Sequence, residues 1–348
     1  MKNIIISILF IFCFLISGTA FSAESVKDTS VLYTGKIYHI FFHSLVIYPN
    51  LAFFSKKDDN QTYKDYMITR DEFEKILPEL YKNNFVLIEI NSLYKVNSDN
   101  SIEKQNLYLP VGKKPLIISL DDLNYYRTKK DRGMANKLVL DQNGNVATEI
   151  VTPDGKIEIT RDGDIVPLLD DFVIAHPDFS IDGAKGIIAL TGFDGVLGYR
   201  TSKIYAKNYS TEILGAQKVI EKLKSTGWSF ASHSYSHRAS FVAGTISLEE
   251  LKKDTELWRD RVASLVGNTN IFIGPFGQVF RNKNDPRRIY LMSQGFKVFC
   301  GVGMDLYINY SSNYLDMNRA DIDGYRLTHA SFYLKDYFDP KLIVDYLR

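Results

Sequence analysis

The chain has 348 residues, of which 45% are hydrophobic and 24% are charged, and its formal net charge is +1. This balance is typical of a globular protein with enough apolar side chains for a core. The near-zero net charge gives no electrostatic reason to expect a nucleic-acid partner or an anionic membrane surface, so we expect neither.

Residues 1–22 have the plan of a secretory signal peptide. One lysine precedes an apolar run from Ile4 to Ile16, and small residues follow that run. Cleavage after Ser22 or after Ala20 fits the pattern. The run is shorter than the roughly 20 residues that a membrane span needs, so an uncleaved anchor is the less favoured alternative. We therefore expect a secreted or cell-envelope protein whose mature chain has no stable membrane span.

Residues 23–348 then form the mature chain, which we interpret as a single domain. Its only cysteine is Cys300, so it contains no internal disulfide and its core must be stable without one. Apolar runs at 37–47, 85–90 and 114–120 predict buried strands. A helix is predicted over 69–84, with Thr69 as its cap and a kink or break near Pro78, its internal proline.

A different pattern occupies residues 138–166, where short alternating segments are separated by turn signals. Asn143-Gly144, Asp154-Gly155 and Asp162-Gly163 are dipeptides that favour tight turns between antiparallel strands. We interpret residues from about 130 to 170 as a β-hairpin insertion on the main scaffold.

Strands and helices alternate again after the insertion. Repeated alternation of this kind predicts a parallel sheet with helices packed on it. Seven or eight repeats in about 320 residues favour a closed or nearly closed (β/α) barrel, so the expected fold class is α/β. Strands are predicted at 186–193, 228–234, 270–277, 297–303 and 325–332, and helices at 167–177, 211–227, 247–267, 287–296 and 340–348.

Chemically useful groups follow several predicted strands at the point where each strand ends, which in a barrel brings them to one rim. Two imidazoles and one carboxylate suit a catalytic divalent metal such as Zn²⁺, and a second carboxylate could act as general base on water. A further histidine could protonate the leaving group, and a backbone N–H at a tight turn could stabilise an oxyanion. This set predicts metal-assisted hydrolysis of an amide or ester. The residues concerned are Asp121, Asp122, His233, His237, Phe276 and His329.

The order of the segments "SLDD", "HSYSH", "GPFG" and "LTH", with "FFHSL" before them, resembles the polysaccharide deacetylase family (the NodB-homology domain, carbohydrate esterase family 4). The resemblance spans residues 37 to about 335. It implies a distorted (β/α) barrel that removes acetyl groups from N-acetylated or O-acetylated sugars in a cell-wall or extracellular polysaccharide. Zn²⁺ is the expected metal, with Co²⁺, Ni²⁺ or Mn²⁺ as alternatives. By this resemblance Asp121 is the base, Asp122, His233 and His237 hold the metal, Phe276 offers its N–H to the oxyanion, and His329 is the acid.

The sequence departs from that family at one position that matters for catalysis. The arginine that orients the catalytic aspartate in the family is replaced by Ile273. Arg200 or Arg319 could substitute for it from another strand end. Asp321 and Asp323 are the two residues that could tune the acid histidine, and His43 could line the pocket from the first strand.

Other interpretations of these residues remain open. The histidine pair could be two polar loop residues, the aspartate pair a helix cap, and His329 a buried structural histidine. Two other functions follow from the same sequence. The missing arginine would suit a non-catalytic protein that binds glycans, and the metal ligands alone would suit an amidase or esterase that acts on compounds other than sugars.

Overall fold

The structure is a computed structural model, and it describes residues 30–242 and 244–348. The signal peptide expected at residues 1–22 lies outside the described residues. Within the described ranges, no helix combines the length and apolar character needed to cross a membrane.

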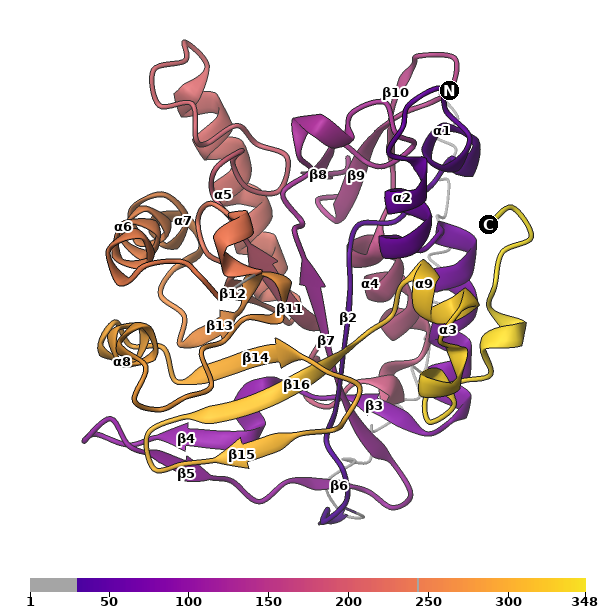
Figure 1. Cartoon of the computed structure of the whole chain (residues 1–348). Coiled ribbons are helices and arrows are strands. Elements are labelled where there is room, and N and C mark those ends of the chain that lie inside the picture. The colour runs from indigo at the N-terminus through magenta and orange to yellow at the C-terminus, as the bar shows by residue number, and fades with distance from the viewer. Residues whose placement is uncertain (1–29, 243) are drawn as a thin grey trace, which may run out of the picture.

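Seven parallel strands form a closed barrel at the centre of the molecule (Figure 1). The barrel closes because β7 pairs with β2 on one side and with β11 on the other. This confirms the predicted α/β barrel and sets its strand number at seven. In order around the barrel the strands are β11 (Gly186–Leu190), β12 (Trp228–Ser232), β13 (Ile271–Ile273), β14 (Val298–Val302), β16 (Leu315–Asp321), β2 (Tyr38–Phe42) and β7 (Lys114–Asp121).

The barrel is irregular where its pairings are short. β12 pairs with β13 only through Ser232 and Phe272, and β16 pairs with β2 only through Ala320 and Asp321. The strands are buried on both faces, as expected for parallel strands that helices cover from outside. Successive side chains therefore alternate between the barrel interior and the layer of helices.

This alternation separates two apolar cores. Leu116, Ile118 and Leu120 of β7 face the helices, whereas Ile117 belongs to a second cluster that includes Ile187, Ala231, Ile273 and Met317 from other barrel strands. The second cluster fills the barrel interior. Its members on β7 and β16 have odd residue numbers. The side chains of the next odd-numbered residues on these strands therefore also point into the barrel interior, closer to its carboxyl end.

Two helices begin at capping boxes that the sequence supplies. Thr69 and Glu72 form a capping box at the start of α3, and Ser247 and Glu250 form another at α6. α3 continues through Pro78 as one helix. The α-helices are α1 (Pro49–Phe53), α2 (Asn60–Tyr66), α3 (Arg70–Lys82), α4 (Ile165–Ala175), α5 (Tyr209–Ser225), α6 (Leu248–Trp258), α7 (Ser264–Val266), α8 (Pro286–Ser293) and α9 (Gly324–Thr328).

The insertion forms a three-stranded antiparallel sheet at the end of the barrel toward which β7 points (Figure 1). Its strands are β8 (Lys137–Leu140), β9 (Val146–Val151) and β10 (Ile157–Thr160). At the opposite end lie several short strands. They are β1 (Ser30–Leu32) with β6 (Tyr108–Pro110), β4 (Tyr94–Val96) with β5 (Ile102–Lys104), β3 (Phe85–Leu87) beside the start of β7, and β15 (Ile308–Tyr310) beside β16.

Two predicted elements near the C-terminus are wrong. The strand expected at 325–332 is helix α9 followed by a 3₁₀ turn, and the last barrel strand is β16, which precedes it. The terminal helix expected at 340–348 is reduced to a single 3₁₀ turn at Pro340–Leu342. β16 was missed because its interior-facing side chains include a charged arginine, whose partner lies on another strand.

Candidate active site

Three potential metal ligands converge at the carboxyl ends of β7 and β12. Asp122 follows β7, and His233 and His237 follow β12. One ligand atom from each of the three lies within 4.8 Å of the others. His237 Nε2 is 3.8 Å from Asp122 Oδ2. One carboxylate and two imidazoles are a donor set that suits Zn²⁺ and related divalent metals.

A hydrogen bond determines which ring nitrogen of His233 carries a proton. His233 Nδ1 lies 2.8 Å from the carbonyl oxygen of Ile273. Because a carbonyl oxygen only accepts, Nδ1 must carry a proton, so a neutral ring presents the lone pair of Nε2 on the side of the carboxylates. Nε2 is 3.9 Å from Asp121 Oδ2. This arrangement is the one that metal-ligating histidines use, so the side chain fits the predicted role.

The loop that carries His237 is held by an aspartate on α6. Asp254 accepts hydrogen bonds from the Tyr235 N–H at 2.6 Å and the Ser236 N–H at 3.0 Å, and also from the Ser236 hydroxyl. Ser234 and His237 both adopt positive φ, of 58° and 47°. Such backbone conformations persist only where the surroundings fix them, and Asp254 supplies part of that constraint.

Asp254 was not anticipated from the sequence, although a signal for it exists. It lies on the buried face of α6 together with Leu251, Thr255 and Trp258. A carboxylate on the apolar face of an amphipathic helix must find hydrogen-bond donors, because an unpaired buried charge is costly. The loop after β12 provides those donors.

Burial and neighbouring charges set the protonation of the ligands. Burial raises the pKa of the Asp122 carboxyl, but His237 and His233 more than offset this and hold the pKa well below its ordinary value. Burial lowers the pKa of His237, and the charge of Asp122 opposes that effect only in part. A charged carboxylate and a neutral imidazole are the forms that bind a metal.

Asp121 is held by an arginine from β16, which is separated from β7 by β2 alone. Arg319 on β16 donates to both carboxylate oxygens of Asp121, at 2.7 and 2.9 Å, and both side chains are buried. Burial has the largest single effect and raises the pKa of Asp121, but the neighbouring cationic groups, led by Arg319, together outweigh it and lower the pKa below its ordinary value. The ring of Phe41 lies 4.2 Å from the guanidinium carbon and covers its face.

The Asp121–Arg319 pair continues into the barrel through polar side chains. Arg319 Nη1 donates to the Ser119 hydroxyl at 3.0 Å, and His39 Nε2 lies 3.1 Å from the same hydroxyl. Since Ser119 accepts from the arginine, its own proton can be given to His39. These residues occupy the interior positions below Asp121, so the network fixes the arginine from beneath.

Two further predicted residues lie at the same rim. His43 follows β2, and burial lowers its pKa to about 4 although the charges of Asp121 and Asp122 oppose that shift. Phe276 has a φ of 54°, and its half-exposed ring lies 4.3 Å from the ring of His237. The Phe276 N–H belongs to the first turn of a 3₁₀ element, where amides have no acceptor within the helix.

His329 is placed differently from these residues. It is exposed at the end of α9, where its ring stacks on Tyr325 at 5.1 Å and its Nδ1 lies 2.7 Å from the Thr328 hydroxyl. Among the described residues, no hydrogen bond, ion pair or ring contact joins it to Asp121 or to the three potential ligands.

The remaining predicted residues make contacts of their own. Arg200 donates to the carbonyl oxygens of Tyr125 and Asp194 at 2.8 and 3.0 Å, so it braces two rim loops and does not contact Asp121. Asp321 accepts from Arg326 Nε at 2.9 Å. Asp323 caps α9 by accepting from the Arg326 N–H at 2.8 Å.

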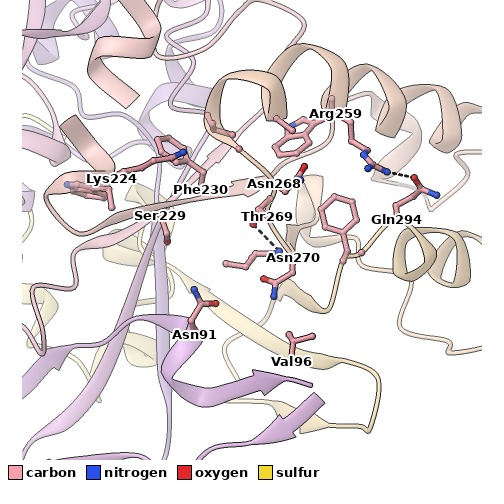
Figure 2. A pocket seen from close by; sticks show the side chains of 18 of the residues that line it. Asn91, Val96, Lys224, Ser229, Phe230, Arg259, Asn268, Thr269, Asn270 and Gln294 are labelled. Atoms are coloured by element: carbon pink, nitrogen blue, oxygen red, sulfur yellow. Dashed lines mark hydrogen bonds between the residues drawn. The ribbon is translucent and has the colours of Figure 1, made fainter. Parts of the chain in front are cut away.

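A separate cavity of about 900 Å³ lies at the amino ends of β12 and β13 (Figure 2). Arg259 and Gln294 are joined across its edge by a hydrogen bond of 2.6 Å, and Asn91 and Asn270 face it from other segments. None of the predicted site residues lines this cavity. The candidate active site therefore occupies the opposite, carboxyl end of the barrel.

Comparisons with known proteins give structural similarities only. No protein-family model matches the chain, and no curated protein matches its sequence. The chain is similar to the Streptococcus pyogenes deacetylase PplD in complex with acetate, with 15% identity, 84% of this chain and 94% of that chain covered, and a TM-score of 0.45. It is also similar to a polysaccharide deacetylase from Bacillus cereus, with 12% identity, 87% of this chain and 69% of that chain covered, and a TM-score of 0.47. A third similar structure is IcaB from Ammonifex degensii, with 11% identity, 87% of this chain and 98% of that chain covered, and a TM-score of 0.42.

Proposed function

We propose that the chain is a metal-dependent hydrolase that removes acetyl groups from N-acetylated or O-acetylated sugars of a cell-wall or extracellular polysaccharide. The observation that carries this proposal is a buried carboxylate, Asp121, held by Arg319 beside the ligand atoms of Asp122, His233 and His237. A general base next to a metal site is the arrangement that hydrolysis of an acetamide requires.

Asp122, His233 and His237 would hold the metal. Their donor atoms, the proton on His233 Nδ1 and the lowered pKa values of Asp122 and His237 all suit Zn²⁺, with Co²⁺, Ni²⁺ or Mn²⁺ as alternatives. When bound, a divalent metal supplies Lewis-acid polarisation of water and of the acyl oxygen.

The protein's own groups would carry the proton transfers. Asp121 accepts the proton of the attacking water, and Arg319 keeps both carboxylate oxygens in place while that happens. The Phe276 N–H donates to the oxyanion that forms on the acetyl carbon. A histidine would protonate the leaving nitrogen or oxygen. The resemblance assigns this role to His329, and His43, on which the charges of Asp121 and Asp122 act, is the second candidate.

Arg319 also favours catalysis over glycan binding alone. The non-catalytic alternative was motivated by Ile273, which occupies the place of the family's arginine. The guanidinium that Ile273 lacks is supplied by Arg319 from β16, and it contacts both oxygens of the proposed base. Hydrolysis therefore remains the function that the site supports best, and the resemblance in the sequence is what directs the proposal to acetylated sugars.

The proposal is tested by Asp121→Asn. We expect acetate release from acetylated oligosaccharides to fall by about 10²–10⁴-fold, because the amide cannot accept a proton, while bound metal stays equal to wild type. Unchanged acetate release would remove Asp121 as the base. The same assay on His43→Gln and His329→Gln identifies the proton donor, and small acetyl esters or amides tested alongside separate the sugar substrate from a non-sugar one.

One control addresses folding. Asp121→Asn leaves the buried charge of Arg319 unpaired, which can destabilise the protein. The double variant Asp121→Asn with Arg319→Gln restores neutrality, and thermal unfolding of both variants shows whether lost turnover reflects lost structure. If neither variant nor wild type releases acetate while wild type binds the oligosaccharides, the protein is a glycan-binding protein.

A further inference from the structure

Tyr126 connects the loop after β7 to one oxygen of Asp122. The Tyr126 hydroxyl donates to Asp122 Oδ1 at 2.5 Å, whereas Asp122 Oδ2 is the oxygen 3.8 Å from His237 Nε2. The two carboxylate oxygens therefore have separate partners. One is hydrogen-bonded to the phenol, and the other is paired with His237.

The hydrogen bonds around Tyr126 have a defined direction. Its hydroxyl has one proton, which the ionised Asp122 receives because a carboxylate only accepts. Thr191 Oγ1 lies 2.7 Å from the same hydroxyl, so Thr191 must donate to Tyr126. Thr191 directly follows β11 and is fully buried. The series Thr191, Tyr126, Asp122 thus ends on Oδ1, whereas Oδ2 is the oxygen paired with His237.

The phenol ring is fixed independently of its hydroxyl. Phe193 stacks on it with ring centres 4.8 Å apart and planes 24° from parallel. The Asn124 side chain accepts from the Thr191 N–H at 3.2 Å and donates to the Thr191 carbonyl at 2.8 Å. The loops after β7 and β11 are therefore joined, so the ring position does not depend on Asp122.

We propose that Tyr126 is a positioning residue that restricts Asp122 to binding a metal through one oxygen, Oδ2. A carboxylate with two free oxygens can chelate a metal with both, whereas an oxygen that accepts a short hydrogen bond is a poorer ligand. The inference rests on the proposed function only in that the site binds a divalent metal. It adds a role for a residue outside the segments that resemble the deacetylase family.

The test is Tyr126→Phe, which keeps the ring and its stacking on Phe193. Co²⁺ is the probe, since its affinity is measured by competition with a chelator and its visible absorption reports coordination. We expect Co²⁺ to bind about 10–100-fold more weakly. We also expect weaker visible absorption, because Asp122 can then bind through both oxygens and raise the coordination number. Thr191→Val, which removes only the donor to Tyr126, should give a smaller change in the same direction.

A matched control is Tyr199→Phe in the loop after β11. Within the described chain the Tyr199 hydroxyl makes no hydrogen bond, and its ring is partly buried like that of Tyr126. The proposal is overturned if Tyr126→Phe binds Co²⁺ within threefold of wild type or leaves the visible spectrum unchanged. If wild type itself binds no Co²⁺ or Zn²⁺, the proposed metal-dependent function fails instead.

Discussion

The buried pair of Asp121 and Arg319 is the most consequential contact between single residues in the site. Two parallel hydrogen bonds at 2.7 and 2.9 Å fix the carboxylate in orientation as well as in charge. A lysine has the same charge but a single ammonium, so it cannot reproduce this geometry. Because both groups are buried, removing either one leaves the other unpaired in a medium that solvates it poorly.

Two substitutions of Arg319 should show separately how it orients the Asp121 carboxylate and how much it stabilises the fold. Arg319→Lys retains a positive charge but loses the two-point contact, so we expect acetate release to fall at least about tenfold with bound metal unchanged. Arg319→Met leaves Asp121 unpaired and should lower the free energy of unfolding by about 3–5 kcal/mol, measured by urea denaturation.

A second buried pair provides the control for this prediction. Arg288 donates to Asp316 at 2.7 Å, and both side chains are buried away from the metal ligands. Arg288→Met should cost similar stability while the folded fraction keeps its turnover. Equal losses of turnover in Arg288→Met and Arg319→Lys would argue against a specific role for Arg319.

Residue types and spacing identified the candidate metal ligands but not the residues that hold the site in place. Asp122, His233 and His237 are recognisable because metal ligands must come from a few residue types at strand ends. Arg319 could not be distinguished from Arg200, because the choice depends on which strands lie near β7 in the closed barrel. Tyr126 was not considered, since a tyrosine next to a metal ligand carries no distinctive pattern.

Helix α9 is an element for which the local sequence gave a wrong secondary-structure prediction. The segment 325–332 alternates in a way that predicted a strand, yet Asp323 accepts from the Arg326 N–H and starts a helix there. The true strand, β16, contains charged residues that are buried because they are paired, which hydrophobic periodicity cannot detect. Elements with apolar periodicity or clear caps, such as α6 and β7, were predicted well.

The cap of α9 should make stability depend on pH. Burial raises the pKa of Asp323 from 3.8 to about 7. Because the folded-state pKa is the higher one, the native state keeps a proton that the unfolded state has lost, and the free energy of unfolding falls as the pH rises from about 4 to 7. The loss could be on the order of 4 kcal/mol.

Asp323→Asn tests this, since asparagine also caps helices. The variant should gain stability relative to wild type as the pH rises from 5 to 8, measured by urea unfolding. Asp285 caps α8, but interactions with Arg287 lower its pKa. The stability difference between Asp285→Asn and wild type should therefore be constant over this pH range. A constant difference for Asp323→Asn as well would contradict the assignment.

At the scale of the whole molecule, alternation of strands and helices was enough to predict a barrel. The sequence did not predict how the barrel closes, because β7 and β11 pair across an insertion whose path the sequence does not indicate. Within the strand predicted at 85–90, β3 lies outside the closed ring, where it pairs with the start of β7 and forms a bridge from Leu87 to Ser180. Closure matters for function because it brings the ends of β7, β12 and β16 to one rim.

Metal binding should consequently stabilise the entire fold. The ligands come from two strands that are separated in sequence but joined in the barrel, so a metal that binds only the folded state shifts unfolding by mass action. At a free Zn²⁺ concentration about 100 times its Kd, the free energy of unfolding should rise by about 2.7 kcal/mol. Thermal unfolding with Zn²⁺ and with a chelator measures this increment. His237→Ala should abolish it, whereas His176→Ala, whose ring packs against Phe172 away from the site, should keep it even if its baseline stability falls. An equal increment in His237→Ala would mean that Zn²⁺ binds elsewhere on the chain.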